Sequence, residues 1–254
     1  MRAAFPKWDG RKPWVMAVPG GDPGDGPARI TVAATPQLVL PIDDAHRVLV
    51  LAGTPADDDG AELGGHPAQG SLGAVWFARR DDHWQRTGQT DSILWSGFFG
   101  HIGELKRVDL GGGHQAVSVE NGSCWQGFCE DFLSLVGFEA ERAQVLVASQ
   151  AVMSSSVGGT PGCDEALAGG APAPQQDAAA PNADNCFDIG GKWRIQPRAG
   201  AERGDLVISY SGQDLVAAAD GATFVPRKIA ETLVLRYADG AYKPASGKDP
   251  THSL

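Results

Sequence analysis

The sequence lacks a long hydrophobic run and is short of positive charge. No stretch of roughly 18 consecutive apolar residues occurs, so no segment is predicted to cross a membrane as a helix. Lys and Arg number 21 against 31 Asp and Glu, which gives a formal net charge of −10. An acidic surface repels a phosphate backbone, so we expect no nucleic-acid partner. Another protein, preferably a basic one, or a neutral ligand fits this charge better.

The short motifs of common enzyme classes are also missing. The sequence contains no G-x-S-x-G elbow, no P-loop, no H-E-x-x-H motif and no C-x-x-C pair. Any catalytic site would have to be assembled from residues that lie far apart in the chain. We therefore favour a binding protein over an enzyme, and we expect no cofactor.

Convincing amphipathic helices are absent, whereas 34 Gly and 17 Pro punctuate the chain every few residues. Many short segments alternate apolar and polar residues, a pattern typical of half-buried strands. These segments include 38–42, 46–52, 72–77, 115–119, 133–135, 145–147, 193–195, 206–210 and 233–237. Their spacing predicts an all-β fold, either a β-sandwich or a propeller-like arrangement of short antiparallel strands with long loops.

One stretch of the chain differs in amino-acid composition from the rest. The stretch from Gly169 to Asn185 is rich in Ala, Pro, Asn and Gln and has little to bury. We expect a main β body over residues 1–160, a flexible loop over 161–186, and C-terminal strands of the same domain over 187–254.

The sequence has four cysteines, an even number that permits two disulfides. Cys124 and Cys129 have a C-x4-C spacing, which allows a bridge across a tight loop. Cys163 and Cys186 flank the Ala- and Pro-rich stretch and are placed to clasp its base. We predict these two pairs, with a metal site or four free thiols as the alternatives.

Two disulfides would imply an oxidising compartment, so we expect a periplasmic or secreted protein. The high usage of Ala, Gly and Asp is typical of bacterial sequences. The first residues contain charge but no apolar h-region, so we expect a signal peptide to be absent from this sequence.

Seven tryptophans are more than expected, and they supply the binding candidates. Trp125, Gln126 and Phe128 lie inside the predicted Cys124–Cys129 loop, where a stapled backbone lowers the entropic cost of presenting an indole ring. Trp84 lies at a predicted hairpin tip. The alternative for Trp125 is burial beneath its own disulfide.

Two further groups of polar residues are weaker candidates. His101 and His114, with Asp109 between them, could serve acid–base chemistry or bind zinc. A second group, on a Gly-kinked loop, could offer oxygen ligands to calcium or form a solvated turn, and it consists of Asp57, Asp59 and Glu62.

One segment resembles a known family. The sequence VDLGGGHQAVSVEN, from Val108 to Asn121, resembles a blade of the VCBS/FG-GAP type of β-propeller. Such blades usually carry an Asp-rich calcium loop, but here Gly111, Gly112 and Gly113 occupy that place. The resemblance therefore implies a propeller-like blade without implying a calcium role.

Together these observations favour an exported, non-enzymatic binding protein that engages another protein, for example an inhibitor or an immunity-type protein. The alternatives are a carbohydrate-binding or cell-envelope module, supported by the tryptophans, and a hydrolase with a dispersed His, Asp and Ser site.

Overall fold

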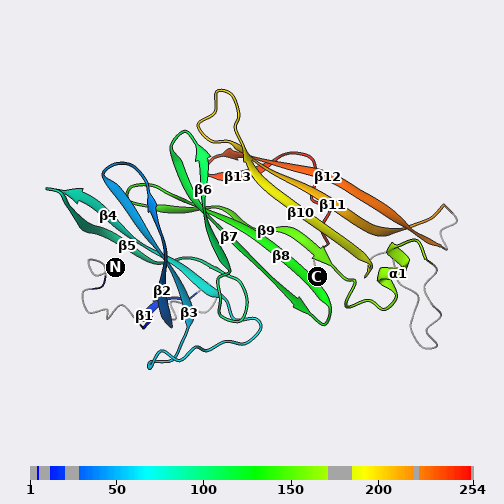
Figure 1. Cartoon of the computed structure of the whole chain (residues 1–254), viewed down its shortest axis with the longest axis horizontal. Coiled ribbons are helices and arrows are strands. Elements are labelled where there is room, and N and C mark those ends of the chain that lie inside the picture. Colours follow the sequence, from blue (N-terminus) through cyan, green and yellow to red (C-terminus); the bar gives the residue numbers. More distant parts are fainter. Residues whose placement is uncertain (1–4, 6–11, 21–28, 171–184, 220–222, 253–254) are drawn as a thin grey trace. The chain divides into compact units, whose positions relative to one another are not determined.

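The computed structural model shown in Figure 1 describes residues 5, 12–20, 29–170, 185–219 and 223–252. Nearly all of its regular structure is β-strand, arranged in two antiparallel sheets, which confirms the all-β class. No helix in the part of the chain described here is long and apolar enough to span a membrane.

The first sheet contains five strands, and each strand pairs with the next along the chain. They are β1 (Trp14–Pro19), β2 (Arg29–Pro41), β3 (His46–Pro55), β4 (Gly70–Arg80) and β5 (His83–Ser96). β2 contains Pro36, whose ring nitrogen cannot donate a ladder hydrogen bond. The register between β2 and β3 shifts next to Pro36, so an irregularity accommodates the proline inside the sheet.

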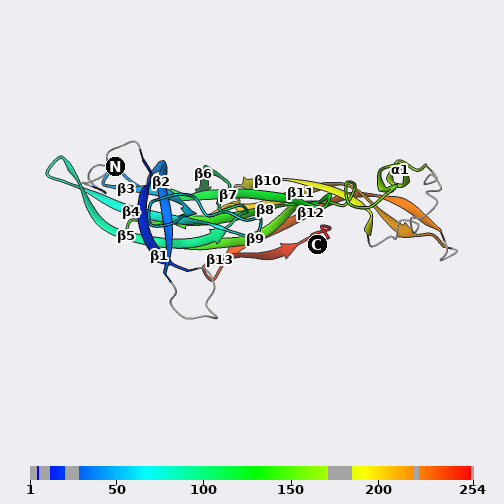
Figure 2. The same cartoon turned by 90° about the horizontal axis from the view of Figure 1, so that it is seen from below.

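The second sheet contains eight strands, also in chain order. They are β6 (Glu104–Gly111), β7 (His114–Trp125), β8 (Phe128–Phe138), β9 (Ala143–Ser155), β10 (Phe187–Gln196), β11 (Asp205–Ala217), β12 (Phe224–Ala238) and β13 (Ala241–Ser246). Most of these strands extend well beyond the alternating segments visible in the sequence. A short helix, α1 (Cys163–Leu167), follows β9 and lies against β11 and β12 (Figures 1 and 2).

The chain groups into two compact units. Unit 1 comprises residues 1–121 and 134–149, and unit 2 comprises 122–133 and 150–254. Strands β7, β8 and β9 each contribute residues to both units. The expected assignment of residues 1–160 and 187–254 to one domain stays a prediction.

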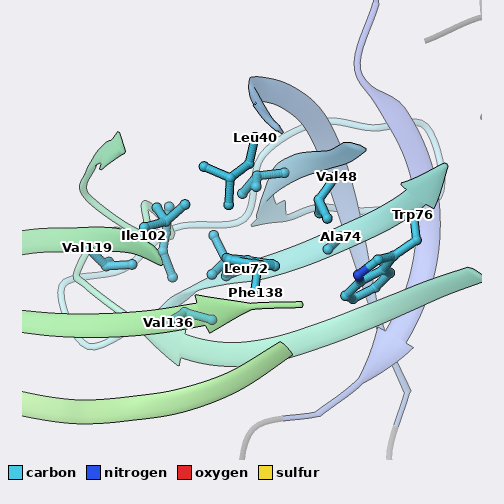
Figure 3. Packing of buried hydrophobic residues seen from close by; sticks show 11 residues of the cluster. Leu40, Val48, Leu72, Ala74, Trp76, Ile102, Val119, Val136 and Phe138 are labelled. Atoms are coloured by element: carbon cyan, nitrogen blue, oxygen red, sulfur yellow. The ribbon is translucent and has the colours of Figure 1, made fainter. Parts of the chain in front are cut away.

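The main core of unit 1 is built from apolar side chains of both sheets (Figure 3). β2, β3 and β4 contribute residues such as Leu40, Val48 and Leu72, and β7 and β8 contribute residues such as Val119 and Phe138. Burial of alternate residues on each strand removes this apolar area from water.

Trp76 on β4 belongs to the same core and is 2% exposed. Its indole Nε1–H donates a hydrogen bond to the Glu139 carbonyl oxygen at 2.9 Å. The ring is therefore buried without leaving its N–H group unsatisfied.

Candidate functional site

The candidate site is the tip of the β7–β8 hairpin in unit 2. β7 ends at Trp125 and β8 begins at Phe128, so Gln126 and Gly127 form a two-residue turn. Both turn residues have positive φ, 51° for Gln126 and 86° for Gly127. Positive φ at both central positions defines a type I′ turn, whose twist matches that of two antiparallel strands.

A disulfide closes the hairpin directly behind the turn. Cys124 and Cys129 are bonded, with their Cα atoms 4.0 Å apart. This pairing is the one that the C-x4-C spacing predicted. The turn residues are therefore held between a covalent cross-link on one side and a tight backbone geometry on the other.

Trp125 lies on the outside of this tip and is 59% exposed, the highest value among the large apolar side chains of the described residues. The alternative expectation, that the indole fills the core beneath its own disulfide, is thus wrong. A tight hairpin end offers no core to fill, so the ring faces solvent. An exposed indole on a stapled backbone is a preorganised contact element.

The tip packs against a glycine pair, Gly158 and Gly159, in the loop after β9. A Cβ added to Gly127 would lie 2.0 Å from the carbonyl carbon of Gly158, so the two backbones are in direct contact. A Cβ on Gly159 would lie 2.5 Å from two ring carbons of Phe128. Only residues without a side chain permit these approaches. Phe128 therefore serves to seat the tip, whereas Trp125 points outward.

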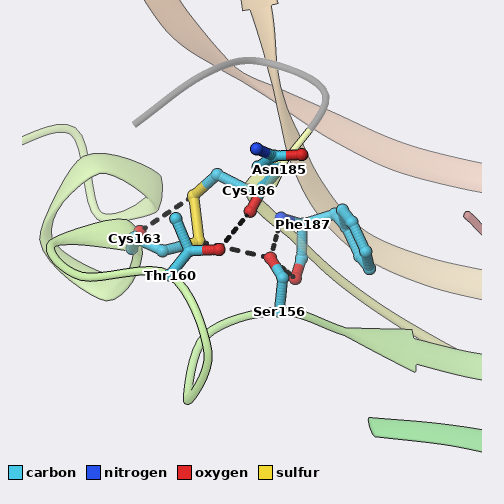
Figure 4. Close-up of a disulfide and its surroundings, with 6 residues drawn as sticks. All are labelled: Ser156, Thr160, Cys163, Asn185, Cys186 and Phe187. Carbon is cyan, nitrogen blue, oxygen red and sulfur yellow. Dashed lines mark hydrogen bonds between the residues drawn. A yellow bond between two sulfur atoms is a disulfide. The ribbon is translucent and has the colours of Figure 1, made fainter. Parts of the chain in front are cut away.

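The loop that carries this glycine pair is itself anchored to β10. Ser156, at its start, donates its backbone N–H to the Phe187 carbonyl oxygen at 2.9 Å. The Phe187 N–H in turn donates to the Ser156 hydroxyl at 3.0 Å, as Figure 4 shows. Both residues are buried.

The second disulfide fastens the other end of the same loop. Cys163 and Cys186 are bonded and fully buried, as the sequence predicted for a clasp (Figure 4). Beside them, the Thr160 hydroxyl donates to the Asn185 carbonyl oxygen at 2.6 Å. α1 occupies part of the segment expected to be a flexible loop, and residues 171–184 lie outside the described residues. Both disulfides thus stiffen the support of one hairpin tip.

Trp84, the other binding candidate, lies on β5 in unit 1, just after the β4–β5 turn. It is 40% exposed, and the Arg47 guanidinium carbon lies 5.0 Å from the centre of its ring. This cation–π contact already engages one face of the indole. Trp84 is also less exposed than Trp125.

The histidine candidates lie near the start of β6 and at the β6–β7 turn. His101 forms an isolated bridge with Phe98, and Asp109 accepts a hydrogen bond from the Gly111 N–H at 2.8 Å within the turn. His114 pairs with Gly111 across the same turn. Among the described residues, no group of three or more His, Cys, Asp or Glu side chains has a metal-holding arrangement.

The calcium candidates lie in an exposed loop after β3. The Asp57 carboxylate accepts hydrogen bonds from the backbone N–H groups of Asp59 at 3.0 Å and Ala61 at 2.8 Å. Glu62 is part of a bridge with Ala56. These contacts are those of a solvated turn closed by its own aspartate.

Sequence reasoning missed a buried polar group in unit 2. Asp214 on β11 is 2% exposed and accepts two hydrogen bonds from the Arg227 guanidinium. The His252 Nε2 atom lies 3.8 Å from the same carboxylate. These residues lie far apart in the chain, and no local pattern connects them. Because the carboxylate is buried and paired, the group fastens the strands together rather than offering a reactive site.

Comparisons of the chain with protein-family models, with curated proteins and with solved structures found no match. The resemblance of Val108–Asn121 to a propeller blade stays a prediction.

Proposed function

We propose that this chain is an exported binding protein that engages another protein through the β7–β8 tip. The observation that carries the proposal is the 59% exposed Trp125 on a hairpin closed by the Cys124–Cys129 disulfide. Aromatic residues dominate the energetics of protein interfaces when they enter a pocket on the partner. A rigid tip loses little conformational entropy on binding, so more of the contact energy remains as affinity.

The charge suggests what kind of partner fits. With a net charge of −10, the chain attracts a basic protein at long range and repels an acidic one. An inhibitor or immunity-type role, in which the tip enters a cleft of a basic enzyme, is the form of this proposal that we favour.

The cysteines support the proposed location. Two disulfides persist in oxidising compartments and are rare in a reducing cytosol. This supports a periplasmic or secreted protein.

The test uses a partner protein captured from the exported proteins of the native host. It measures how tightly that partner binds two variants of this chain, each with one apolar side chain truncated. Trp125→Ala removes the proposed anchor, while Val39→Ala truncates a side chain that is 54% exposed in unit 1. We expect Trp125→Ala to weaken the complex by about 30-fold or more, the effect of losing a hot-spot aromatic. Val39→Ala should leave the dissociation constant unchanged. Equal affinity of the wild type and Trp125→Ala for the captured partner would overturn the proposal.

Carbohydrate binding is the second candidate, because an exposed indole can also stack on a sugar ring. Titration with neutral oligosaccharides separates the two functions. Quenching of Trp fluorescence that Trp125→Ala abolishes, without a protein partner, would favour the carbohydrate module.

A further inference from the structure

A second surface of unit 2 gathers positive charge on an otherwise acidic chain. Strands β10, β12 and β13 and the loop after β10 expose five cationic side chains, here named the basic face, which are Lys192, Arg194, Arg198, Arg236 and Lys243. The carboxylates next to these cations are Asp205 and Asp239, and the exposed Asp188 lies on the same face, four residues before Lys192 on β10. In the turn between β10 and β11, Glu202 and Arg203 carry opposite charges and add no net charge.

Strand register places the four strand residues Lys192, Arg194, Arg236 and Lys243 on the same face. Side chains on one strand alternate between faces, so Lys192 and Arg194 share a face and are about 7 Å apart along β10. Arg194 is opposite Val207 on β11, and Val207 is opposite Val234 on β12. The same alternation places Arg236, two residues after Val234, on this face.

Arg236 and Arg198 are held in place by one buried carboxylate. Asp205 accepts hydrogen bonds from the Arg236 guanidinium at 3.3 and 3.4 Å and forms an ion pair with Arg198 Nε at 3.2 Å. One negative charge is thus shared between two guanidinium groups. On the neighbouring strand β13, Lys243 lies directly opposite Arg236.

We infer that the basic face binds a linear anionic polysaccharide, a sugar chain carrying carboxylate, sulfate or phosphate groups. Guanidinium groups offer paired N–H donors that match the oxygens of such groups. An array of cations spread over adjacent strands of a sheet suits an extended chain that meets several of them in turn.

The net charge of the whole chain favours a thin polymer, rather than a broad anionic surface, as the ligand of the basic face. At physiological salt, charges act over about 8 to 10 Å, so a single sugar chain along this face is influenced mainly by its five cations. A bilayer or a nucleic-acid duplex would also meet the acidic remainder of a chain with net charge −10.

The absence of an apolar anchor argues against a protein partner at this face. The exposed large apolar side chains of the described residues lie elsewhere, on the β7–β8 tip, at the start of β12 and in unit 1. Protein interfaces usually depend on a buried aromatic or aliphatic anchor. The inference therefore concerns a surface other than the Trp125 tip and does not rest on the function proposed for that tip.

The experiment measures binding of the full chain to dextran sulfate and to polygalacturonate, with uncharged dextran as the blank, over a series of NaCl concentrations. The test variant is Lys192→Gln with Arg194→Gln. The matched control is Arg79→Gln with Arg80→Gln, which removes the same charge from exposed positions on β4 in unit 1.

We expect the test variant to bind at least one of the charged polymers about tenfold more weakly than the wild type and to show a shallower salt dependence. The control variant and Trp125→Ala should bind like the wild type, which separates this inference from the proposed function. Equal losses in the test and control variants would mean that net charge alone matters. Such equal losses would overturn the inference. So would the absence of binding to either charged polymer at about 50 mM NaCl, or tighter binding to anionic phospholipid vesicles or to duplex DNA.

Discussion

The His252 imidazole stacks on the Phe187 ring, with the ring centroids 4.3 Å apart and an interplanar angle of 9°. The two residues are 65 positions apart in the chain. The same segment is also fastened through its backbone, because the His252 N–H donates to the buried Ser154 hydroxyl at 3.1 Å. The residues after β13 are thus fastened to the β9–β10 region that supports the candidate tip.

His252→Ala should lower the stability of unit 2. It removes the stack on Phe187 and the approach to Asp214, and an aromatic pair contributes about 1 kcal/mol. The measurement is the urea midpoint followed by intrinsic fluorescence. His83→Ala, which changes an exposed residue next to the β4–β5 turn, is the matched control and should leave the midpoint unchanged. Equal midpoints for both variants would show that the stack is not stabilising.

Gly127→Ala should disturb the candidate tip much more than Gly113→Ala. Both positions have positive φ, 86° and 80°, so both substitutions strain the backbone similarly. At Gly127 the added Cβ would also meet the Gly158 backbone, whereas nothing lies within 4 Å of a Cβ at Gly113. We expect Gly127→Ala to cost about 1 to 3 kcal/mol more than its control, in the range of overpacked sites. Thermal unfolding measures the difference, and equal losses would mean that the tip does not rest on Gly158.

The two disulfides should contribute unequally to stability. The Cys163–Cys186 bond spans 23 positions and the Cys124–Cys129 bond spans 5. In the chain-entropy model the longer loop stabilises by roughly 3.5 kcal/mol and the shorter by roughly 2 kcal/mol. Replacing each pair by alanines and comparing urea unfolding tests the order. A thiol titration of the native, unreduced wild type should find no free thiol, and four reactive thiols would contradict both bonds.

Alkaline pH should weaken unit 2 through its buried tyrosines. Burial raises the pKa of Tyr242 to about 12 and also raises the pKa of Tyr210 above its ordinary value of 10.0. Above pH 10 the unfolded chain releases phenolic protons that the folded chain retains, so the free energy of unfolding falls as pH rises from 10 through 12.

Tyr242→Phe tests this dependence. At pH 7 the variant should lose about 1 kcal/mol, because the Tyr242 hydroxyl no longer donates to the Gly204 carbonyl oxygen. Between pH 10 and 12 it should lose less further stability than the wild type does. Parallel curves for the two proteins, from urea unfolding at each pH, would contradict the assignment.

Much of the fold could be predicted from local patterns. Alternation in segments such as 206–210 and 233–237 marks strands, because one face of a pleated strand is buried. The two cysteine pairs were predictable as well, since each closes a loop that composition or spacing already marks. The outer parts of some strands were not: the first five residues of β5 and of β12 are all exposed, so both faces meet water and the alternation fades.

The sequence by itself determined the all-β class, the disulfide pairs and the choice of Trp125 as a candidate, because each depends on residues close together in the chain. Only the tertiary structure decided that the Trp125 ring faces solvent, that Gly158 supports the tip, and that Asp214 meets Arg227 and His252. It also placed Arg194 and Arg236 on one face of a sheet. These relations depend on strand register and on contacts between distant segments, which local sequence patterns do not encode.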